Sequence, residues 1–258
     1  MGAIASLILP TKPTAILLWR LLLAFGHRRA AVAAVVSVAL CGLGSLALLH
    51  FDAACWARWL EGTWRYATQT DLFASPDFGF PPFTWMNQSL RCAVARVLGD
   101  VPETLAAQVP WFVPGMRLSP DVVAGVRIAA SGVLLLVTVV TVMRLRQRTH
   151  ARPALIAAVL ALSLLLSPIA WKAHHVALLP CFALLFTRAL DGARWLWLAV
   201  AIYGVTCVLG EEITGKAVKE LLQSSYAVTL GAFGFWLAAL RWAHQDDFSV
   251  QPAATRRG

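Results

Sequence analysis

The sequence predicts an all-α, polytopic membrane protein with about seven transmembrane helices. The first observation is composition: of the 258 residues, 59% are hydrophobic and only 14% are charged, a balance typical of chains whose helices face lipid. The second is that apolar runs recur along the chain. We place these runs at about residues 3–25, 30–50, 121–143, 153–167, 175–190, 195–209 and 224–242.

The placement of the arginines is the third observation, and it predicts an orientation. Arginines cluster just after the first apolar run, between residues 144 and 152, between residues 188 and 194, and after residue 241. By the positive-inside rule these joints are cytoplasmic. The N-terminus, the 51–120 segment, the segment around His174 and the 210–222 loop then lie on the outer face of the cell membrane.

This orientation divides the chain into regions. We expect an integral membrane domain over residues 1–247, with an extracytoplasmic loop subdomain at 51–120, and a disordered cytoplasmic tail at 248–258. The net charge of +9 does not indicate nucleic acid as a partner, because the basic residues stand between apolar runs rather than on one face of a soluble fold.

The cysteines give little reason to expect a metal or a cofactor. The five cysteines show no short paired spacing, which argues against a zinc or iron–sulfur site. We therefore expect no metal site and no cofactor. Cys55 and Cys92 share the outer loop, where an oxidising compartment would permit a disulfide, but two free thiols are the expected state.

The outer loop has three parts. Residues 52–72 place tryptophans among charged residues, which predicts an amphipathic helix on the membrane surface. Residues 75–82 are rich in proline and glycine and predict irregular backbone. The third part carries the polar residues Asn87, Gln88, Ser89 and Arg96. Either Asn87 or Ser89 can cap the following helix, and such groups beside tryptophans are suited to gripping sugar hydroxyls or a phosphate.

The stretch from Ser167 to His175 places a proline, a lysine and two histidines between two apolar runs. Polar groups at that depth mark functional sites more often than packing. If Pro168 opens a helix, then Trp171, His174 and His175 project from one face. The alternative is that Trp171 anchors the helix at the interface while the histidines cap its end.

A third polar point, Lys12, is followed by Pro13 inside the first apolar run. Its ammonium either lines a cavity and meets an anionic group, or reaches the interface from a kinked helix. The three motifs occur in the order Lys12-Pro13, then Asn87-Gln88-Ser89-Leu90 with Arg96, then Ser167-Pro168-Ile169-Ala170-Trp171 with His174. In this order and topology they resemble the polyprenyl-phosphate-sugar-dependent membrane glycosyltransferases of family 87.

The resemblance covers essentially the whole chain and implies a GT-C fold. It implies a hexosyltransferase that takes mannose, or in some members arabinofuranose, from a polyprenyl-phosphate donor. The acceptor would be lipid-linked or another glycan, outside the cytoplasm. It also implies His174, three residues after the tryptophan, as the catalytic residue. The substrate-binding residues implied are Lys12, Asn87, Gln88, Ser89, Arg96 and Trp171.

Two departures from the family pattern affect what is carried over. The family usually has glycine where this chain has Cys92. The catalytic base of the fold is a carboxylate on the first outer loop, which the resemblance places upstream of Met1. The chain would then correspond to the C-terminal two-thirds of such an enzyme, as a fragment, a wrongly assigned start or a degenerate copy.

The chemistry of the implied reaction narrows the candidates for each role. A sugar that leaves from a phosphate needs cations near that phosphate and a base near the acceptor hydroxyl. Lys12, Arg96 and His174 are the candidate cations. Asp71 and Asp77 are the only acids in the irregular middle of the outer loop. The alternatives are a transporter whose broken helices line a substrate path, and a membrane protein that binds polyprenyl phosphate without catalysis.

Overall fold

The computed structural model describes residues 16–48, 50, 52–74, 81–109, 111–171, 174–175, 178–190, 197–198, 200–201, 204 and 211–245. Within these ranges the chain is mostly helical and forms no strand. The predicted all-α class is therefore confirmed for the described residues. Lys12, Asp77 and the predicted tail at 248–258 lie outside them.

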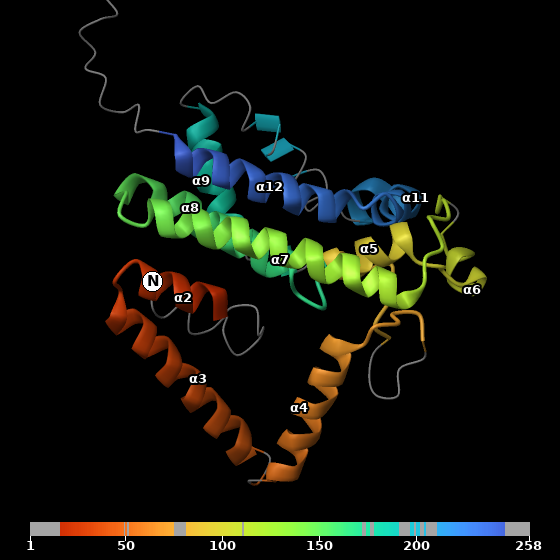
Figure 1. Ribbon diagram of the computed structural model, residues 1–258, viewed down its shortest axis with the longest axis horizontal. Coiled ribbons are helices and arrows are strands. Elements are labelled where there is room, and N and C mark those ends of the chain that lie inside the picture. Colours follow the sequence, from red (N-terminus) through yellow and green to blue (C-terminus); the bar gives the residue numbers. More distant parts are fainter. Residues whose placement is uncertain are drawn as a thin grey trace, which may run out of the picture.

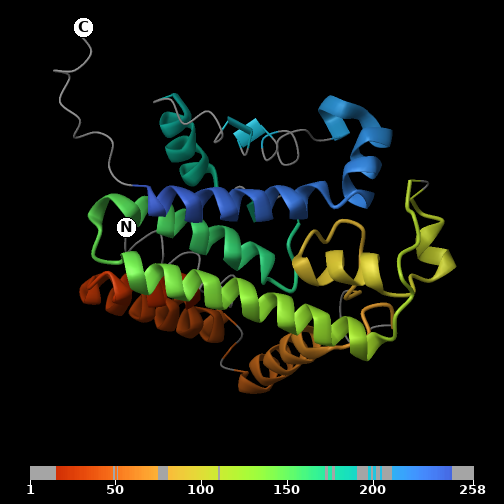
Figure 2. The same ribbon diagram turned by 45° about the horizontal axis from the view of Figure 1, so that its top comes forward.

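Three helices form the centre of the molecule and lie side by side in both ribbon views (Figures 1 and 2). They are α7 (Pro120–Leu145), α8 (Arg152–Leu165) and α12 (Ala227–His244). Proline stands in the first turn of both α7 and α8, where its missing N–H costs nothing. Ten of the 14 residues of α8 are buried, so α8 is the core helix. Helices α2 (Ile16–Ala24) and α9 (Leu179–Leu190) pack against it.

Two of the described helices are long and apolar enough to cross a membrane, α3 (Arg28–Leu48) and α7. A third candidate is the pair formed by α11 (Glu211–Ser224) and α12, which is bent by 65°. The runs predicted at 153–167 and 175–190 are helices of only 14 and 12 residues, well short of the roughly 20 needed to span. The run at 195–209 lies mostly outside the described residues, as does the first half of the run at 3–25.

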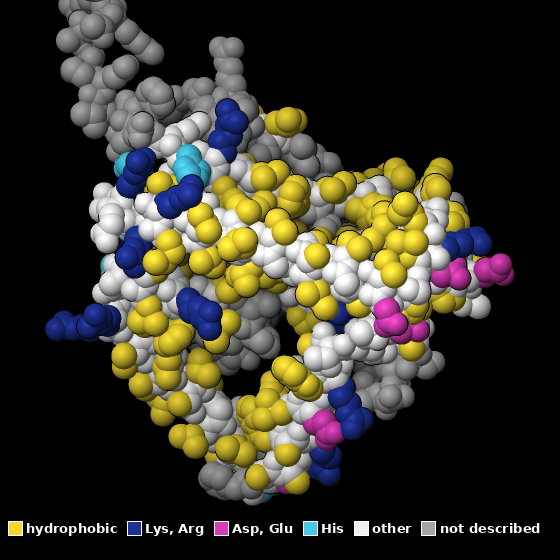
Figure 3. Space-filling model, viewed as in Figure 1, with side chains coloured by type: hydrophobic (Ala, Val, Ile, Leu, Met, Phe, Trp, Pro, Cys, Tyr) yellow, Lys and Arg dark blue, Asp and Glu magenta, His cyan; other side chains and the backbone are white. Residues whose placement is uncertain are grey.

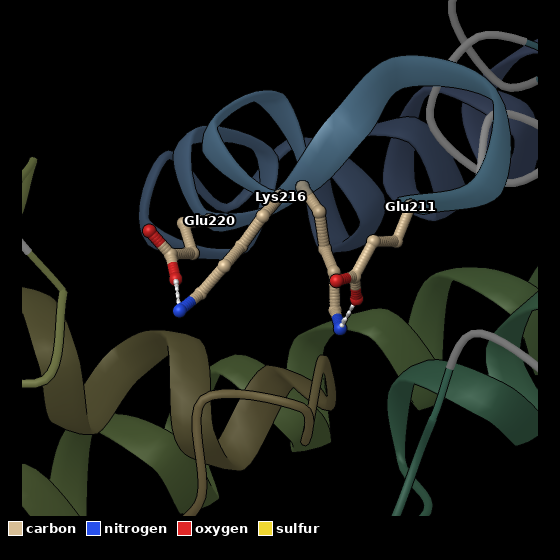
Figure 4. A network of polar contacts seen from close by, with 4 residues as sticks. Glu211, Lys216 and Glu220 are labelled. Carbon is tan, nitrogen blue, oxygen red and sulfur yellow. Dashed lines mark hydrogen bonds and ion pairs between the residues drawn. The ribbon is translucent and has the colours of Figure 1, made fainter.

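Helix α11 differs in character from α12. Lys219 bonds to Glu211, and the Lys216 Nζ lies 3.8 Å from the Glu220 Oε1, so an ion-pair network covers its surface (Figure 4). Such exposed pairs contribute little to stability. Charged groups this dense are costly inside lipid. The 18 residues of α12, roughly 27 Å at 1.5 Å per residue, are therefore the apolar part of the pair.

Helices α3 and α4 (Ala53–Thr68) form the two arms of a V in Figure 1. Only Ala31 and Ala34 of α3 are buried, and α4 has no buried residue. Asp52 caps α4, because its side-chain oxygen accepts hydrogen bonds from the backbone amides of Ala54 and Cys55. The amphipathic helix predicted at 52–72 is thus confirmed as a helix with an exposed apolar surface.

The basic joints gather at one end of the bundle, which we call the basic end. It contains the α2–α3 turn, the α7–α8 turn and the last turn of α12, and Arg152 of one turn lies over the ring of Phe25 of another. Arginine and histidine side chains cluster there in Figure 3. The acidic side chains visible on that face lie toward the opposite end and along α4. This segregation fits a helical bundle with two differently charged faces.

Residues of the 51–120 segment build a second small core at the opposite end from the basic one. It contains α5 (Leu90–Leu98) and α6 (Glu103–Ala106), and its buried residues include Phe83, Trp85 and Cys92 together with Val123 of α7. The chain returns along α5 at Gly115, where any Cβ would meet the Val97 carbonyl oxygen at 1.8 Å. Only glycine fits this close approach.

Candidate functional site

Asn87 connects two of the sequence motifs across 81 residues. Its Nδ2 donates to the carbonyl of Pro168 at 2.9 Å, and its Oδ1 accepts from the amide of Ala170 at 3.0 Å. The backbone amide of Gln88 donates to the Ala170 carbonyl at 2.7 Å. Ser89, and not Asn87, is the residue that caps α5, with its hydroxyl accepting from the Cys92 amide. The motif around residue 87 and the motif around residue 168 are therefore one structural unit.

Arg96 ties a third segment to the same unit. Its Nη1 donates to the Gln223 carbonyl at the end of α11 at 2.8 Å. Its Nη2 donates to three carbonyls of the segment that precedes α5, those of Thr84, Trp85 and Asn87. The side chain is fully buried, and its guanidinium also lies 5.2 Å from the centroid of the Trp85 ring. Burial lowers its pKa.

We call this set of contacts the polar junction: Asn87, Gln88, Ser89 and Arg96 with their partners in 168–170, Gln223 and Thr229. Thr229 of α12 joins it by donating its hydroxyl to the Gln88 carbonyl at 2.8 Å. All four predicted substrate-binding residues of this motif are buried, and their side chains bond mainly to backbone groups. Contact of these side chains with a substrate stays a prediction, whereas their contribution to holding three segments together is direct.

Trp171 and His174 also lie together. Their rings are stacked, with centroids 5.9 Å apart and planes inclined by 6°. The Trp171 amide donates to His174 Nδ1 at 3.1 Å, and the Trp171 carbonyl lies 3.1 Å from His175 Nδ1. His174 is partly exposed whereas His175 is buried. The predicted gathering of these three residues is therefore present.

The backbone that produces this gathering is not the expected helix. Residues 167–171 are not helical, so the expectation that Pro168 opens a helix is wrong. Asn87 instead bonds to the Pro168 carbonyl and to the Ala170 amide, and the Pro168 carbonyl is a group that a helix would use for its own bond to the N–H four residues later. A single i to i+3 bond, from the His174 amide to the Trp171 carbonyl at 2.8 Å, brings the rings together instead.

The hydrogen bonds fix different proton positions on the two histidines. An amide donates to His174 Nδ1, so that nitrogen carries no proton and the neutral ring is protonated on Nε2. A carbonyl can only accept, so His175 Nδ1 carries the proton in its bond to Trp171. His174 is thus a ring whose N–H donor is Nε2, while a neutral His175 has a lone pair there.

A cavity of about 290 Å³ lies beside the polar junction and was not predicted from the sequence. Its polar lining comes from Arg91 of α5 and from Arg127 and Ser131 of α7. Its apolar lining comes from Ala67, Ile128, Leu165, Leu166 and Pro168. We call it the arginine cavity. One signal could have revealed it: Arg127 is the single charge within the apolar run 122–143, and such charges mark functional positions.

The two arginines of this cavity converge on one carbonyl. Arg91 Nη2 donates to the Gln69 carbonyl at 2.9 Å and Arg127 Nη1 to the same oxygen at 3.3 Å, while Arg91 Nη1 donates to the Tyr66 carbonyl at 2.6 Å. Burial, and then repulsion from Arg127, lowers the pKa of Arg91 to about 10. No carboxylate lies within ion-pair distance of either arginine among the described residues.

Asp71, the described candidate base, lines a neighbouring pocket of about 260 Å³. Ala95 and Val123 also line that pocket. Ala95 lies about one helical turn after Arg91 and Val123 about one turn before Arg127, so the two cavities are neighbours along α5 and α7. The Asp71 Oδ1 accepts from the amide of Phe73 at 2.9 Å. Cys92, where the family pattern has glycine, is fully buried, and burial raises the pKa of its thiol. Cys55 and Cys92 are free thiols.

Comparisons with protein-family models, with curated proteins and with solved structures find no match for this chain. Among the described residues no group of three or more histidine, cysteine, aspartate or glutamate side chains has an arrangement that could hold a metal ion. The candidate site therefore consists of the polar junction, the Trp171–His174 pair and the arginine cavity.

Proposed function

We propose that this chain belongs to a membrane glycosyltransferase that moves a hexosyl group, with mannose as the expected sugar and arabinofuranose as the alternative. The donor is a polyprenyl-phosphate sugar, and the acceptor is a lipid-linked or other glycan on the extracytoplasmic face. The proposal includes a multi-pass architecture of about seven spans related to the GT-C fold. Its active face is the end of the bundle opposite the basic end.

One observation carries the proposal. Asn87 and Gln88 bond directly to the 168–170 segment, so two motifs that suggest the same enzyme class meet in space although 81 residues separate them. They meet at the end that holds the second small core, away from the arginine-rich joints. This is the end where the positive-inside rule puts the outer face. A polyprenyl-phosphate donor would present its sugar at that level.

His174 acts in this proposal as a neutral hydrogen-bond donor. Because its Nδ1 accepts from the Trp171 amide, protonating that nitrogen would break the bond that orients the ring. The Nε2–H therefore donates to a sugar hydroxyl or to an oxygen of the departing phosphate, where a donor is worth most as negative charge develops. Trp171, stacked on the imidazole, fixes the plane of the ring.

The test is a transfer assay with radiolabelled polyprenyl-phosphate mannose in membranes of the cells that naturally make the protein. The variants His174→Ala and His175→Ala are compared, with thermal stability measured beside rate. Losing the proposed bond should lower the rate about 30- to 1000-fold, equal to about 2–4 kcal/mol. His174→Gln, whose amide can replace Nε2–H, should keep part of the activity. An unchanged rate in His174→Ala, or inactivation by His175→Ala alone, would sink the assignment.

A membrane protein that binds polyprenyl phosphate without transferring sugar is the second candidate. The observation that favours it is the burial of Asn87, Gln88 and Arg96 in bonds to backbone carbonyls, because such a junction would support lipid binding equally well. In the same assay this protein would retain the labelled lipid but release no glycosylated acceptor. The Asp71→Asn substitution would then change neither the amount of labelled lipid retained nor the absence of glycosylated acceptor.

A further inference from the structure

The arginine cavity places two guanidinium groups in a setting that calls for an anion. Arg91 is only 6% exposed, and its Nε has no hydrogen-bond partner among the described residues. Arg127 is partly buried beside it, and both arginines donate to the single carbonyl of Gln69. Two cations removed from water without an opposite charge are costly, so this cavity carries a positive field that nothing within the described chain neutralises.

The cavity lining suits a group with several oxygens. Ser131 stands four residues after Arg127 on α7, so its hydroxyl lies on the same face of the helix. Arginine presents planar donors that match phosphate oxygens in pairs. A volume of about 290 Å³ is close to the lower bound of roughly 300 Å³ for small-molecule pockets. A phosphate group with the first part of its substituent fits this size.

The remaining walls indicate what the phosphate is attached to. Ile128, Leu166 and Pro168 line the cavity on its apolar side. Arg127 stands seven residues into the 26-residue α7, roughly 10 Å along its axis, which is near the outer boundary of a hydrocarbon layer about 30 Å thick. Cationic groups at that depth meet lipid head groups, and apolar walls beside them meet the adjoining chain.

We propose that the arginine cavity binds the phosphate group of a lipid phosphate, with Arg91 and Arg127 contacting its oxygens and Ser131 donating a further bond. Identifying the lipid chain as isoprenoid, and the lipid as the glycosyl donor, rests on the proposed function, whereas the binding of a lipid phosphate does not. Pro168 links the two: its side chain lines the cavity while its carbonyl accepts from Asn87 of the polar junction. Burial and repulsion from Arg127 lower the pKa of Arg91, and an anion bound between the two arginines would oppose that lowering.

The experiment measures equilibrium binding of tritiated farnesyl phosphate to the purified full chain in detergent. Unlabelled farnesyl phosphate should displace the label, while farnesol and inorganic phosphate at the same concentration should not. Arg127→Gln should weaken binding roughly 10- to 100-fold, the range for losing bonds to a charged group. Arg144→Gln is the matched control, because it makes the same change on an exposed arginine at the other end of α7.

Each other outcome overturns the proposal in a defined way. Equal displacement by inorganic phosphate would make this a site for free phosphate, and equal displacement by farnesol would make it an apolar site only. Binding that survives Arg127→Gln and Ser131→Ala unchanged would place the lipid elsewhere. Arg91 is tested in the same way with Arg91→Gln. If that variant fails to fold, Arg91→Lys takes its place, because it keeps the positive charge. The probe carries no sugar, so a failed transfer assay with intact binding would remove the enzyme assignment and leave this site standing.

Discussion

Arginines at the two ends of the bundle have opposite environments. At the basic end, Arg28, Arg29 and Arg144 are exposed. At the other end, Arg91 and Arg96 are buried, and Arg127 is partly buried. The exposed arginines stand in clusters at helix ends, where their charge can set the orientation of the chain. Those at the other end belong to α5 and α7 and donate to backbone carbonyls. The same residue type is thus exposed and clustered at one end, and buried in hydrogen bonds to carbonyls at the other.

The orientation implied by this contrast has an all-or-none test. Gln108→Cys and Gln147→Cys introduce single thiols at exposed positions of the two ends, in a chain whose native cysteines are replaced by serine or alanine. A membrane-impermeant maleimide applied to intact cells should label position 108 and leave position 147 unlabelled until the membrane is opened. Native Cys92 is unsuitable for this purpose, because it is fully buried and burial raises its pKa.

Labelling of the thiol at position 147 alone would show that the molecule is inverted. Both sites are read against a permeabilised, denatured sample, in which each should react fully. Equal labelling of both thiols in intact, unopened cells would contradict the assignment of the two ends to opposite sides of a membrane.

The largest difference in stability should come from Arg96. Arg96→Ala removes four hydrogen bonds to backbone carbonyls and leaves a cavity at a fully buried side chain, so we expect the free energy of unfolding to fall by about 3–5 kcal/mol. Arg144→Ala at the basic end should change it by less than about 0.5 kcal/mol. Thermal unfolding in detergent measures both variants. Comparable losses in the two would contradict the structural role given to the polar junction.

A smaller effect should come from Thr229, whose hydroxyl links α12 to the Gln88 carbonyl. Thr229→Val keeps the shape of the side chain and removes one buried hydrogen bond, which should lower the free energy of unfolding by about 1–2 kcal/mol. Thr149→Val, an exposed position at the basic end, is the matched control and should be close to neutral. The same unfolding measurement applies. A loss of stability in Thr149→Val but not in Thr229→Val would contradict the role given to the Thr229 hydroxyl.

A change of stability with pH should come from Tyr66, which lies beside the arginine cavity. Burial raises its pKa from 10.0 to about 12. Between these values the unfolded chain loses the phenolic proton while the folded chain keeps it, so stability should fall as the pH rises from about 10 to 12. The phenolate absorbance of the native protein minus that of Tyr66→Phe reports the titration of this one group. A midpoint in the ordinary range near 10 would contradict the burial of this phenol.

The sequence foresaw the local features that depend on neighbouring residues. A side-chain cap at Asn87 or Ser89 is predicted because both residue types cap helices, and Ser89 is the one that does so. Helix α4 follows from the spacing of its tryptophans among charges. The clustered arginines predicted which helix ends would share a face. Each of these depends on side chains within one or two turns of each other, and such contacts are present in any fold that the chain adopts.

The sequence could not foresee which apolar helices would be buried. The α3 and α8 helices are both rich in alanine, valine and leucine, yet α3 is almost wholly exposed and α8 is almost wholly buried. In a membrane protein, residues that face lipid and residues that face the core are chemically alike, so apolar patterns do not separate them. The seven apolar runs correspond to two described spanning helices, or three if the bent pair is counted. Two of the other runs form helices of only 14 and 12 residues, and the runs at 3–25 and 195–209 lie partly or mostly outside the described residues.

The sequence by itself therefore determined the helical class and the separation of charge between the two ends, and it limited the cap of α5 to Asn87 or Ser89. Tertiary structure alone decided that Asn87 would bond to Pro168 and Arg96 to Gln223, across 81 and 127 residues, and that Pro168 would not open a helix. It also decided that Arg91 and Arg127 would share one cavity. The physical reason is that a buried donor bonds to whichever carbonyl the packing of distant helices brings near, and no local pattern encodes that choice.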